Sequence, residues 1–279
     1  MSLATPLLPG PVDLEALETD AAPGFDGKKA DGKVALAEMG EELADLQERL
    51  FALRAVGTRR RVLLVLQGMD TSGKGGTLRH TVGLMDPQGV RITSFKAPSD
   101  EEREHDFLWR VEKAVPSPGY VGVFDRSHYE DVLIGRVREL APAAEIERRY
   151  DEINDFEQRL TDEGTTIIKC MLHISADEQK ERLLARLDDP TKHWKYNPGD
   201  LDERARWSAY RSAYEIALER TSTEVAPWHV IPSDKKWYRN LAVGRLLLDA
   251  LRGLDLAWPA ADFDVEEQRR LLHDEPSVS

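Results

Sequence analysis

The feature that most constrains the fold is a glycine-rich segment that directly follows a short, continuous apolar run. The run at residues 62–66 is typical of a strand buried on both faces of a parallel sheet. The segment after it, residues 68–74 (GMDTSGK), fits the pattern G-x-x-x-x-G-K. Glycines let backbone N–H groups turn toward phosphate oxygens, and the lysine adds a full positive charge. Because a helix-forming segment follows, the pattern predicts a phosphate-binding loop rather than an ordinary glycine-rich turn.

The loop departs from the common pattern at the position after the lysine. A Ser or Thr that holds Mg²⁺ usually stands there, whereas this chain has Gly75 followed by Gly76. Another residue must therefore hold the metal. Asp70, within the loop, is the candidate, because a carboxylate beside bound phosphates needs a cation to offset the repulsion. The alternative role for Asp70 is an Asx turn that stabilises the loop.

Further apolar runs predict four more strands, at residues 90–95, 120–124, 165–174 and 228–231. The intervals between the runs are long enough for crossover helices, so we expect an α/β sandwich with a mostly parallel sheet. Helices are expected over residues 34–55, from a capping box at Ser99 and Glu102 through Trp109, and over residues 235–251. The apolar stripe of the first helix suits packing on its own domain and a subunit contact equally well.

Charge and composition exclude several classes of protein. Of the net charge of −13, residues 1–50 carry −7 and residues 251–279 carry −4, so the middle of the chain is nearly neutral, with clustered bases. This balance argues against a nucleic-acid partner but allows a local site for a polyanion. No apolar run is long enough to predict a membrane span, and the first ten residues lack the pattern of a secretory signal. The single cysteine, Cys170, fits the cytoplasm, where we expect this protein.

A second acidic position follows another predicted strand. Asp125 and Arg126 come directly after the run at residues 120–124. In an open parallel sheet this edge lies beside the ligand crevice, so Asp125 is expected to organise Mg²⁺ or orient the attacking phosphate oxygen, and Arg126 to clamp phosphate oxygens. The alternative is a pair that only caps the next helix. Glu130 is expected to influence the choice of acceptor, and His128 to be packed rather than catalytic.

A third cluster predicts a lid over about residues 180–215. Arg182 and Arg186 are four residues apart and share a helix face. A basic and aromatic loop follows at residues 188–199, and a second helix is expected from Asp200 onward. Such a lid would close arginines over a transferring phosphoryl group and exclude water. The alternative is a solvated, charged helix.

Taken together, the chain resembles the type-2 polyphosphate kinase family over roughly residues 35–255. The matching segments occur in the family's order, at residues 68–77, 94–99, 105–110, 124–132, 188–195 and 226–232. The pair Gly75-Gly76, unusual for an ATP-driven kinase, is the family's own pattern. The stretch at residues 127–131 (SHYED) resembles the class III subgroup, which accepts both AMP and ADP.

The resemblance implies a three-layer P-loop kinase fold with a five-stranded sheet, a helical lid and a homo-oligomeric assembly of two or four chains. It implies transfer of phosphate from inorganic polyphosphate to purine nucleotides, AMP to ADP and ADP to ATP, with Mg²⁺ as cofactor and Mn²⁺ as an alternative. Catalytic roles are implied for Asp70, Lys74, Asp125, Arg126 and Arg186, with Asp70 and Asp125 also holding the metal. Phosphate or nucleotide binding is implied for Gly68, Met69, Thr71, Ser72, Gly73, Gly75, Gly76, Thr77, Glu130 and Arg182.

These expectations divide the chain into a flexible arm (residues 1–33), a P-loop phosphotransferase domain (34–255) and an acidic tail (256–279).

Two other functions remain open at this point. An ATP-dependent nucleoside monophosphate kinase would also use a P-loop and an Asp-Arg pair after a strand. A nucleotide- or polyphosphate-binding switch without catalysis is the other alternative. A GTPase switch should carry an Asn/Thr-Lys-x-Asp motif, and the sequence contains none.

Overall fold

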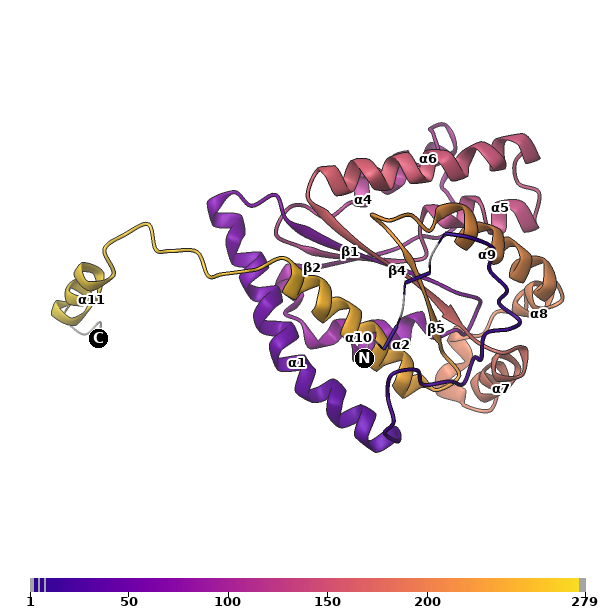
Figure 1. Ribbon diagram of the computed structural model, residues 1–279, viewed down its shortest axis with the longest axis horizontal. Helices are drawn as coiled ribbons and strands as arrows, with labels where there is room; N and C mark the ends of the chain where they lie inside the picture. The colour runs from indigo at the N-terminus through magenta and orange to yellow at the C-terminus, as the bar shows by residue number, and fades with distance from the viewer. Residues whose placement is uncertain (1–2, 5, 8, 276–279) are drawn as a thin grey trace.

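The protein, described here from a computed structural model for residues 3–4, 6–7 and 9–275, is built around a parallel five-stranded sheet with helices on both faces (Figure 1). The strands are β1 (Arg61–Gln67), β2 (Val90–Ser94), β3 (Val121–Asp125), β4 (Thr165–His173) and β5 (Trp228–Pro232). Their order in the sheet is β2-β3-β1-β4-β5, and each neighbouring pair is parallel. β1 lies at the centre and is buried along its whole length, as its continuous apolar run predicts.

Alternate residues of β1 point into two separate cores. Leu64 packs against α1 (Lys29–Ala52) and α10 (Lys236–Gly253) on one face of the sheet. Leu63 packs on the other face, against α6 (Ala143–Asp162) and α9 (Trp207–Thr221). The remaining α-helices are α2 (Lys74–His80), α3 (Asp100–Arg103), α4 (Trp109–Ala114), α5 (Ile134–Val137), α7 (Ala176–Leu187), α8 (Asp200–Arg204) and α11 (Val265–Asp274). Short 3₁₀ turns are η1 (Leu53–Val56), η2 (Val82–Leu84), η3 (Pro87–Gly89), η4 (His128–Asp131) and η5 (Pro190–Lys195).

All five predicted strands are present, and two of the predicted helices correspond to α1 and α10. The helix predicted from Ser99 through Trp109 is wrong in its length. The capping box of Ser99 and Glu102 is formed, but α3 ends at Arg103 and α4 begins only at Trp109. Asp106 interrupts the helix, because its side chain and carbonyl accept the N–H groups of Leu108 and Trp109 in a local turn.

The N-terminal segment, predicted as a loosely ordered arm, makes specific contacts over residues 9–28 and runs past α9 and β5 (Figure 1). Leu14 is 1% exposed and belongs to the core beneath α6 and α9. Its carbonyl lies 2.9 Å from His173 Nε2, and Thr19 Oγ1 donates to Asp234 at 2.6 Å. Composition alone hides these contacts, since they depend on single apolar and polar residues within an acidic stretch.

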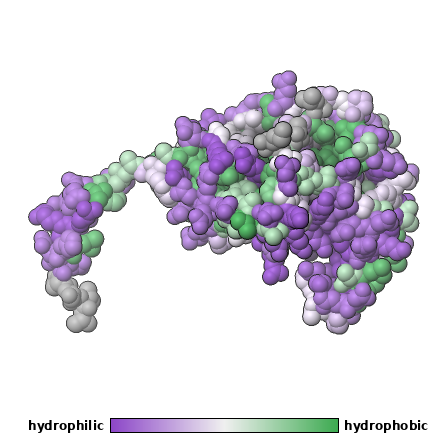
Figure 2. Space-filling view, turned by 60° about the horizontal axis from the view of Figure 1, so that its bottom comes forward, coloured by the Kyte–Doolittle hydropathy of each residue, from purple (hydrophilic) through white to green (hydrophobic). Residues whose placement is uncertain are grey.

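The C-terminal segment leaves the domain after Leu256, whose side chain is still buried. In Figures 1 and 2 α11 stands clear of the domain, mostly hydrophilic with a few apolar side chains. Its segment exposes Phe263, Val265, Leu271 and Leu272. No helix in the described part of the chain is long and apolar enough to cross a bilayer.

A buried ionic network stands between α6 and β4, behind the turn that follows β3. Lys169 is 0% exposed, and its ammonium group donates to Glu157 at 2.5 Å, to Tyr129 Oη at 2.9 Å and to the carbonyl of Thr221 at 2.7 Å. All three donors of the lysine are therefore satisfied. His128 lies against Glu157 in the same network, at 3.3 Å, so it is packed rather than open to a substrate.

Replacing Lys169 with methionine is expected to lower the free energy of unfolding by about 3 kcal/mol, because the change leaves Glu157 buried without its counter-ion. A second substitution, Glu157→Gln in the same background, should recover part of this loss. Urea denaturation followed by circular dichroism measures both quantities. An unfolding free energy within about 0.5 kcal/mol of the wild type for the single variant would contradict the ion-pair account.

Candidate active site

The glycine-rich segment forms a loop that joins β1 to α2. At two positions of this loop only glycine fits. Gly68 has φ +148° and Gly73 has φ +111°, values that other residues rarely adopt. A Cβ atom on Gly68 would lie 2.6 Å from the carbonyl oxygen of Leu172, and one on Gly73 would collide with the guanidinium group of Arg239. The sequence pattern therefore reflects the backbone conformation that a phosphate-binding loop needs.

The back of this loop is held by Arg182, which the sequence analysis expected to contact phosphate. Its guanidinium group is buried and donates to the carbonyls of Thr71 (2.8 Å) and Ser72 (3.0 Å). It also donates to the carbonyl of Ser233 at 2.6 Å and to Glu178 at 2.6 Å. Its N–H groups are thus directed at loop carbonyls rather than into a cavity. In this structure Arg182 therefore holds the loop, and its direct contact with phosphate stays a prediction.

Lys74 lies at the start of α2, with its ammonium group 2.7 Å from the carbonyl oxygen of Gly68. Burial lowers the pKa of Lys74, and the charge of Arg126 lowers it further. Three carboxylates act on the same ammonium group in the opposite direction, those of Asp70, Asp125 and Glu130. Lys74 is therefore surrounded by the acids that the sequence analysis singled out.

The two predicted metal-binding acids lie at the same edge of the sheet. Asp125 pairs with Leu66 across β3 and β1, and Asp70 stands four residues beyond Leu66. Both acids also raise the pKa of Arg126, against the effect of its burial. Asp70 and Asp125 therefore share one electrostatic environment rather than separate surfaces.

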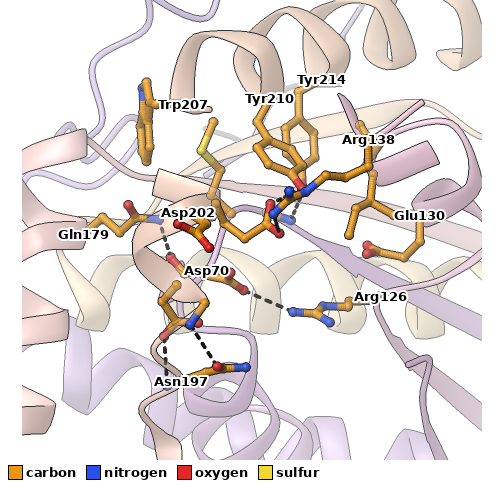
Figure 3. Close-up of a pocket in the computed structure, with 17 residues that line it drawn as sticks. Asp70, Arg126, Glu130, Arg138, Gln179, Asn197, Asp202, Trp207, Tyr210 and Tyr214 are labelled. Atoms are coloured by element: carbon orange, nitrogen blue, oxygen red, sulfur yellow. Dashed lines mark hydrogen bonds and ion pairs between the residues drawn. The ribbon is translucent and has the colours of Figure 1, made fainter. Parts of the chain in front are cut away.

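Arg126 forms the direct link between the loop and the turn after β3. Its Nη2 donates to Asp70 Oδ1 at 3.1 Å, and Figure 3 shows the two side chains pointing toward one another. The backbone of Arg126 has φ 64°, an uncommon left-handed conformation for this residue. Burial raises the pKa of Glu130, although Arg126 and Lys74 oppose the shift.

A cavity of about 290 Å³ opens beside the loop, beneath the helices of the predicted lid (Figure 3). Of the predicted site residues, five line it, namely Gly68, Met69, Asp70, Arg126 and Glu130, whereas Lys74 and Asp125 lie outside its wall. A second cavity, of about 710 Å³, continues on the other side of Arg126, Glu130 and Ile134, which line both. Its other cations are Lys96, Arg103, Arg110, Arg148 and Arg149. Acids of the same lining, Glu102, Asp106, Asp131 and Glu145, largely balance these cations. Arg126 and Glu130 therefore stand where the two cavities meet.

The segment predicted as a lid comprises α7, η5, α8 and α9 rather than two helices, because the second predicted helix is split at residues 205–206. Arg186 donates to the carbonyl of Lys195 at 2.9 Å and lies 3.6 Å from Asp200. Asp200 lines the smaller cavity, but Arg186 does not. In this conformation Arg186 ties the lid loop together, at the rim of the site.

Sequence reasoning missed several side chains that complete the cavity. Gln179 donates to the carbonyl of Asp70 at 3.1 Å, and Tyr214 accepts from the N–H of Gly68 at 3.1 Å. An ion pair between Arg138 and Glu203 closes one wall. Helical spacing alone does not reveal that the hydroxyl group of Tyr214 reaches the loop.

The donor set fits a divalent cation that is shared with a substrate. Within the described residues no cluster of three or more His, Cys, Asp or Glu could hold a metal ion by itself. Mg²⁺ commonly takes only one or two carboxylates, with waters and substrate phosphates completing its octahedron. Asp70 and Asp125 supply two carboxylates, and the contact of Asp125 with Ser94 is long, at 3.5 Å. These residues fit Mg²⁺ bound together with phosphate groups.

Comparison with known proteins decides the family. The sequence model described as "Polyphosphate kinase 2 (PPK2)" matches residues 27–257. The chain belongs to the polyphosphate kinase 2 family. An AMP/ADP-polyphosphate phosphotransferase of Meiothermus ruber is 46% identical over 258 residues, which cover 92% of this chain and 95% of that protein. An ADP-polyphosphate phosphotransferase of Rhodopseudomonas palustris is 40% identical and covers 89% of this chain and 88% of its own.

A solved member of the polyphosphate kinase 2 family has the same architecture. The crystal structure of polyphosphate kinase 2 from Arthrobacter aurescens TC1 superimposes with a TM-score of 0.92 at 62% identity, covering 95% of this chain and 93% of that one. The predicted family resemblance and the predicted α/β P-loop kinase fold are therefore confirmed.

Proposed function

We propose that this protein transfers phosphoryl groups from inorganic polyphosphate to AMP and to ADP. The arrangement of Lys74 and Arg126 among Asp70, Asp125 and Glu130 carries the proposal. It supports transfer between two anions, because cations must offset the repulsion between the donor and the acceptor. The acids would orient these cations and the acceptor phosphate. The name of the Meiothermus ruber relative, which includes both AMP and ADP, supports the choice of acceptors.

Positioning and charge neutralisation supply most of the catalysis that phosphoryl transfer requires. The loop amides and Lys74 hold phosphate oxygens, and Arg126 holds the group in transfer through its planar fork. Asp125 orients the terminal phosphate of the acceptor beside Arg126. Asp70 and Asp125 would hold Mg²⁺, which would supply further positive charge beside the phosphate oxygens.

The lid would complete the site by closing. Arg186 now bonds to the carbonyl of Lys195 and pairs with Asp200 across the lid loop. Closure would exchange these partners for phosphoryl oxygens, which bind a guanidinium group more strongly than a neutral carbonyl does. A catalytic role for Arg186 rests on this motion.

A homo-oligomer of two or four chains stays a prediction, which sedimentation velocity of the purified protein would check.

The affinity for polyphosphate should fall at alkaline pH because of Lys74. Its pKa lies below the ordinary lysine value of about 10.4, so the ammonium charge is lost at a lower pH than for an exposed lysine. Bound polyanion favours the charged form, and the KM for polyphosphate should rise up to about tenfold per pH unit above that pKa. A Lys74→Arg variant keeps its charge over this range, so its KM should rise less steeply than that of the wild type. A wild-type KM that stays constant up to about pH 10 would contradict this role.

An acceptor panel tests the proposed function. The protein is incubated with Mg²⁺, polyphosphate and one of AMP, ADP, GMP or GDP, with no ATP added, and products are separated by ion-exchange chromatography. We expect ADP and then ATP to form from AMP. A Lys74→Ala variant purified in parallel controls for contaminating adenylate kinase. Absence of product from both AMP and ADP would refute the proposal.

A further inference from the structure

Behind the phosphate loop, Arg239 is a buried cation without a carboxylate partner. It lies on α10 and is 2% exposed. Its Nη1 donates to the carbonyl of Ser72 at 3.1 Å, while Nε and Nη2 donate to Asn240 Oδ1 at 3.2 and 2.9 Å. No Asp or Glu of the described chain forms an ion pair with it. Three of the five N–H donors of Arg239 have an acceptor in these hydrogen bonds, and no carboxylate balances its charge.

A second buried guanidinium group makes this charge more costly. Arg182 donates to the same carbonyl of Ser72, at 3.0 Å, and its only ion pair within the described residues is with Glu178. Burial and the repulsion from Arg182 together lower the pKa of Arg239 to about 9. The unliganded loop therefore has an excess of positive charge directly behind it.

Stability alone does not explain this arrangement. A buried charge without a counter-ion destabilises a fold, and an apolar residue of similar volume would be more favourable. An anion bound near the loop would supply the counter-charge that Arg239 lacks.

The second glycine after the lysine shows how close Arg239 is to the loop. A Cβ atom on Gly76 would lie 2.6 Å from Arg239 Nη2, whereas one on Gly75 would meet open space. The same guanidinium group also excludes any residue with a Cβ atom at position 73, where Gly73 stands. Gly73 and Gly76 thus leave room for Arg239, whereas the departure at Gly75 has no such explanation in the structure.

We propose that Arg239 is a positioning residue whose counter-charge is the phosphate anion bound on the front of the loop. It acts through the carbonyl of Ser72, holding the loop while adding positive potential behind it. Binding of a polyphosphate-type anion then completes a charge balance that the free protein lacks. The inference rests on anion binding at this loop, which is part of the proposed function.

The test compares stability with anion binding in Arg239→Met, which removes the charge at similar length, and Arg239→Lys, which keeps it. Sodium tripolyphosphate is the probe, and its affinity is measured by calorimetry and by the shift in thermal unfolding. We expect Arg239→Met to be at least as stable as the wild type without ligand, yet to bind tripolyphosphate about tenfold more weakly. Arg239→Lys should restore affinity to within about threefold of the wild type. The KM for polyphosphate should rise in Arg239→Met while kcat falls much less.

A matched control is Arg61→Met, at the opposite end of β1. Arg61 is also buried but is paired with Glu163 at 2.9 Å, so its loss should reduce stability and leave tripolyphosphate affinity unchanged. The proposal is overturned if Arg239→Met loses stability but binds tripolyphosphate as the wild type does. If that variant does not fold, Arg239→Gln replaces it, and equal affinity in the Gln and Lys variants refutes the proposal. A wild type that binds tripolyphosphate but transfers no phosphate would refute the proposed function alone.

Discussion

Replacing Asp125 with asparagine is expected to lower kcat about 10³-fold, while the dissociation constant for AMP or ADP changes less than about threefold. Asparagine has the same shape and preserves the packing at the end of β3. It removes the negative charge that acts on Lys74 and Arg126 and that would hold Mg²⁺ with Asp70. Because these effects matter most when charge redistributes in the transition state, turnover should suffer more than binding. Steady-state kinetics and equilibrium nucleotide binding separate the two quantities.

The matched control for this prediction is Asp86→Asn. Asp86 caps η3 by accepting from the N–H of Gln88, before the amino end of β2 and away from the site. The control should keep the wild-type kcat. A kcat within threefold of the wild type for Asp125→Asn would remove Asp125 from the site.

Replacing Arg126 with alanine is expected to lower kcat by about 10³-fold or more, in the range found for arginines that stabilise a transferring phosphoryl group. Arg126 lines both cavities and pairs with Asp70, so it stands where donor and acceptor would meet. Its loss also leaves Lys74 as the remaining cation that lowers the pKa of Glu130, so the pKa of that acid should rise further. Single-turnover measurements with polyphosphate and AMP report the chemical step directly.

The lysine variant at the same position separates charge from geometry. Arg126→Lys restores a positive charge but cannot hold two phosphate oxygens at once, so it should recover only part of kcat. If Arg126→Ala raised KM while leaving kcat unchanged, Arg126 would bind ground and transition states equally. Its role as a stabiliser of the transferring group would then be excluded.

The sequence was most informative where function depends on local backbone and on strand ends. The phosphate loop follows from glycines at fixed spacing, and Asp125 joins it because parallel strands end at one edge of the sheet. Both inferences need only a motif and a topology. Both can therefore be made without knowing how the helices pack.

Contacts that depend on helix packing could not be predicted from the sequence. Helical spacing placed Arg182 and Arg186 on one face. It could not show that the guanidinium group of Arg182 would donate to carbonyls of the phosphate loop. Arg239 and Tyr214 reach the loop from α10 and α9, elements far along the chain. The docking of Leu14 depends on one apolar side chain within an acidic stretch, which averaged composition cannot detect.

The choice of phosphate donor tests the central claim most directly. The protein is given AMP and Mg²⁺ with either polyphosphate or ATP as the only donor, at equal concentrations of phosphoanhydride bonds, and ADP formation is followed over time. We predict rapid formation of ADP from polyphosphate, loss of this activity in Lys74→Ala, and much slower transfer from ATP. Formation of ADP with ATP but not with polyphosphate would contradict the account.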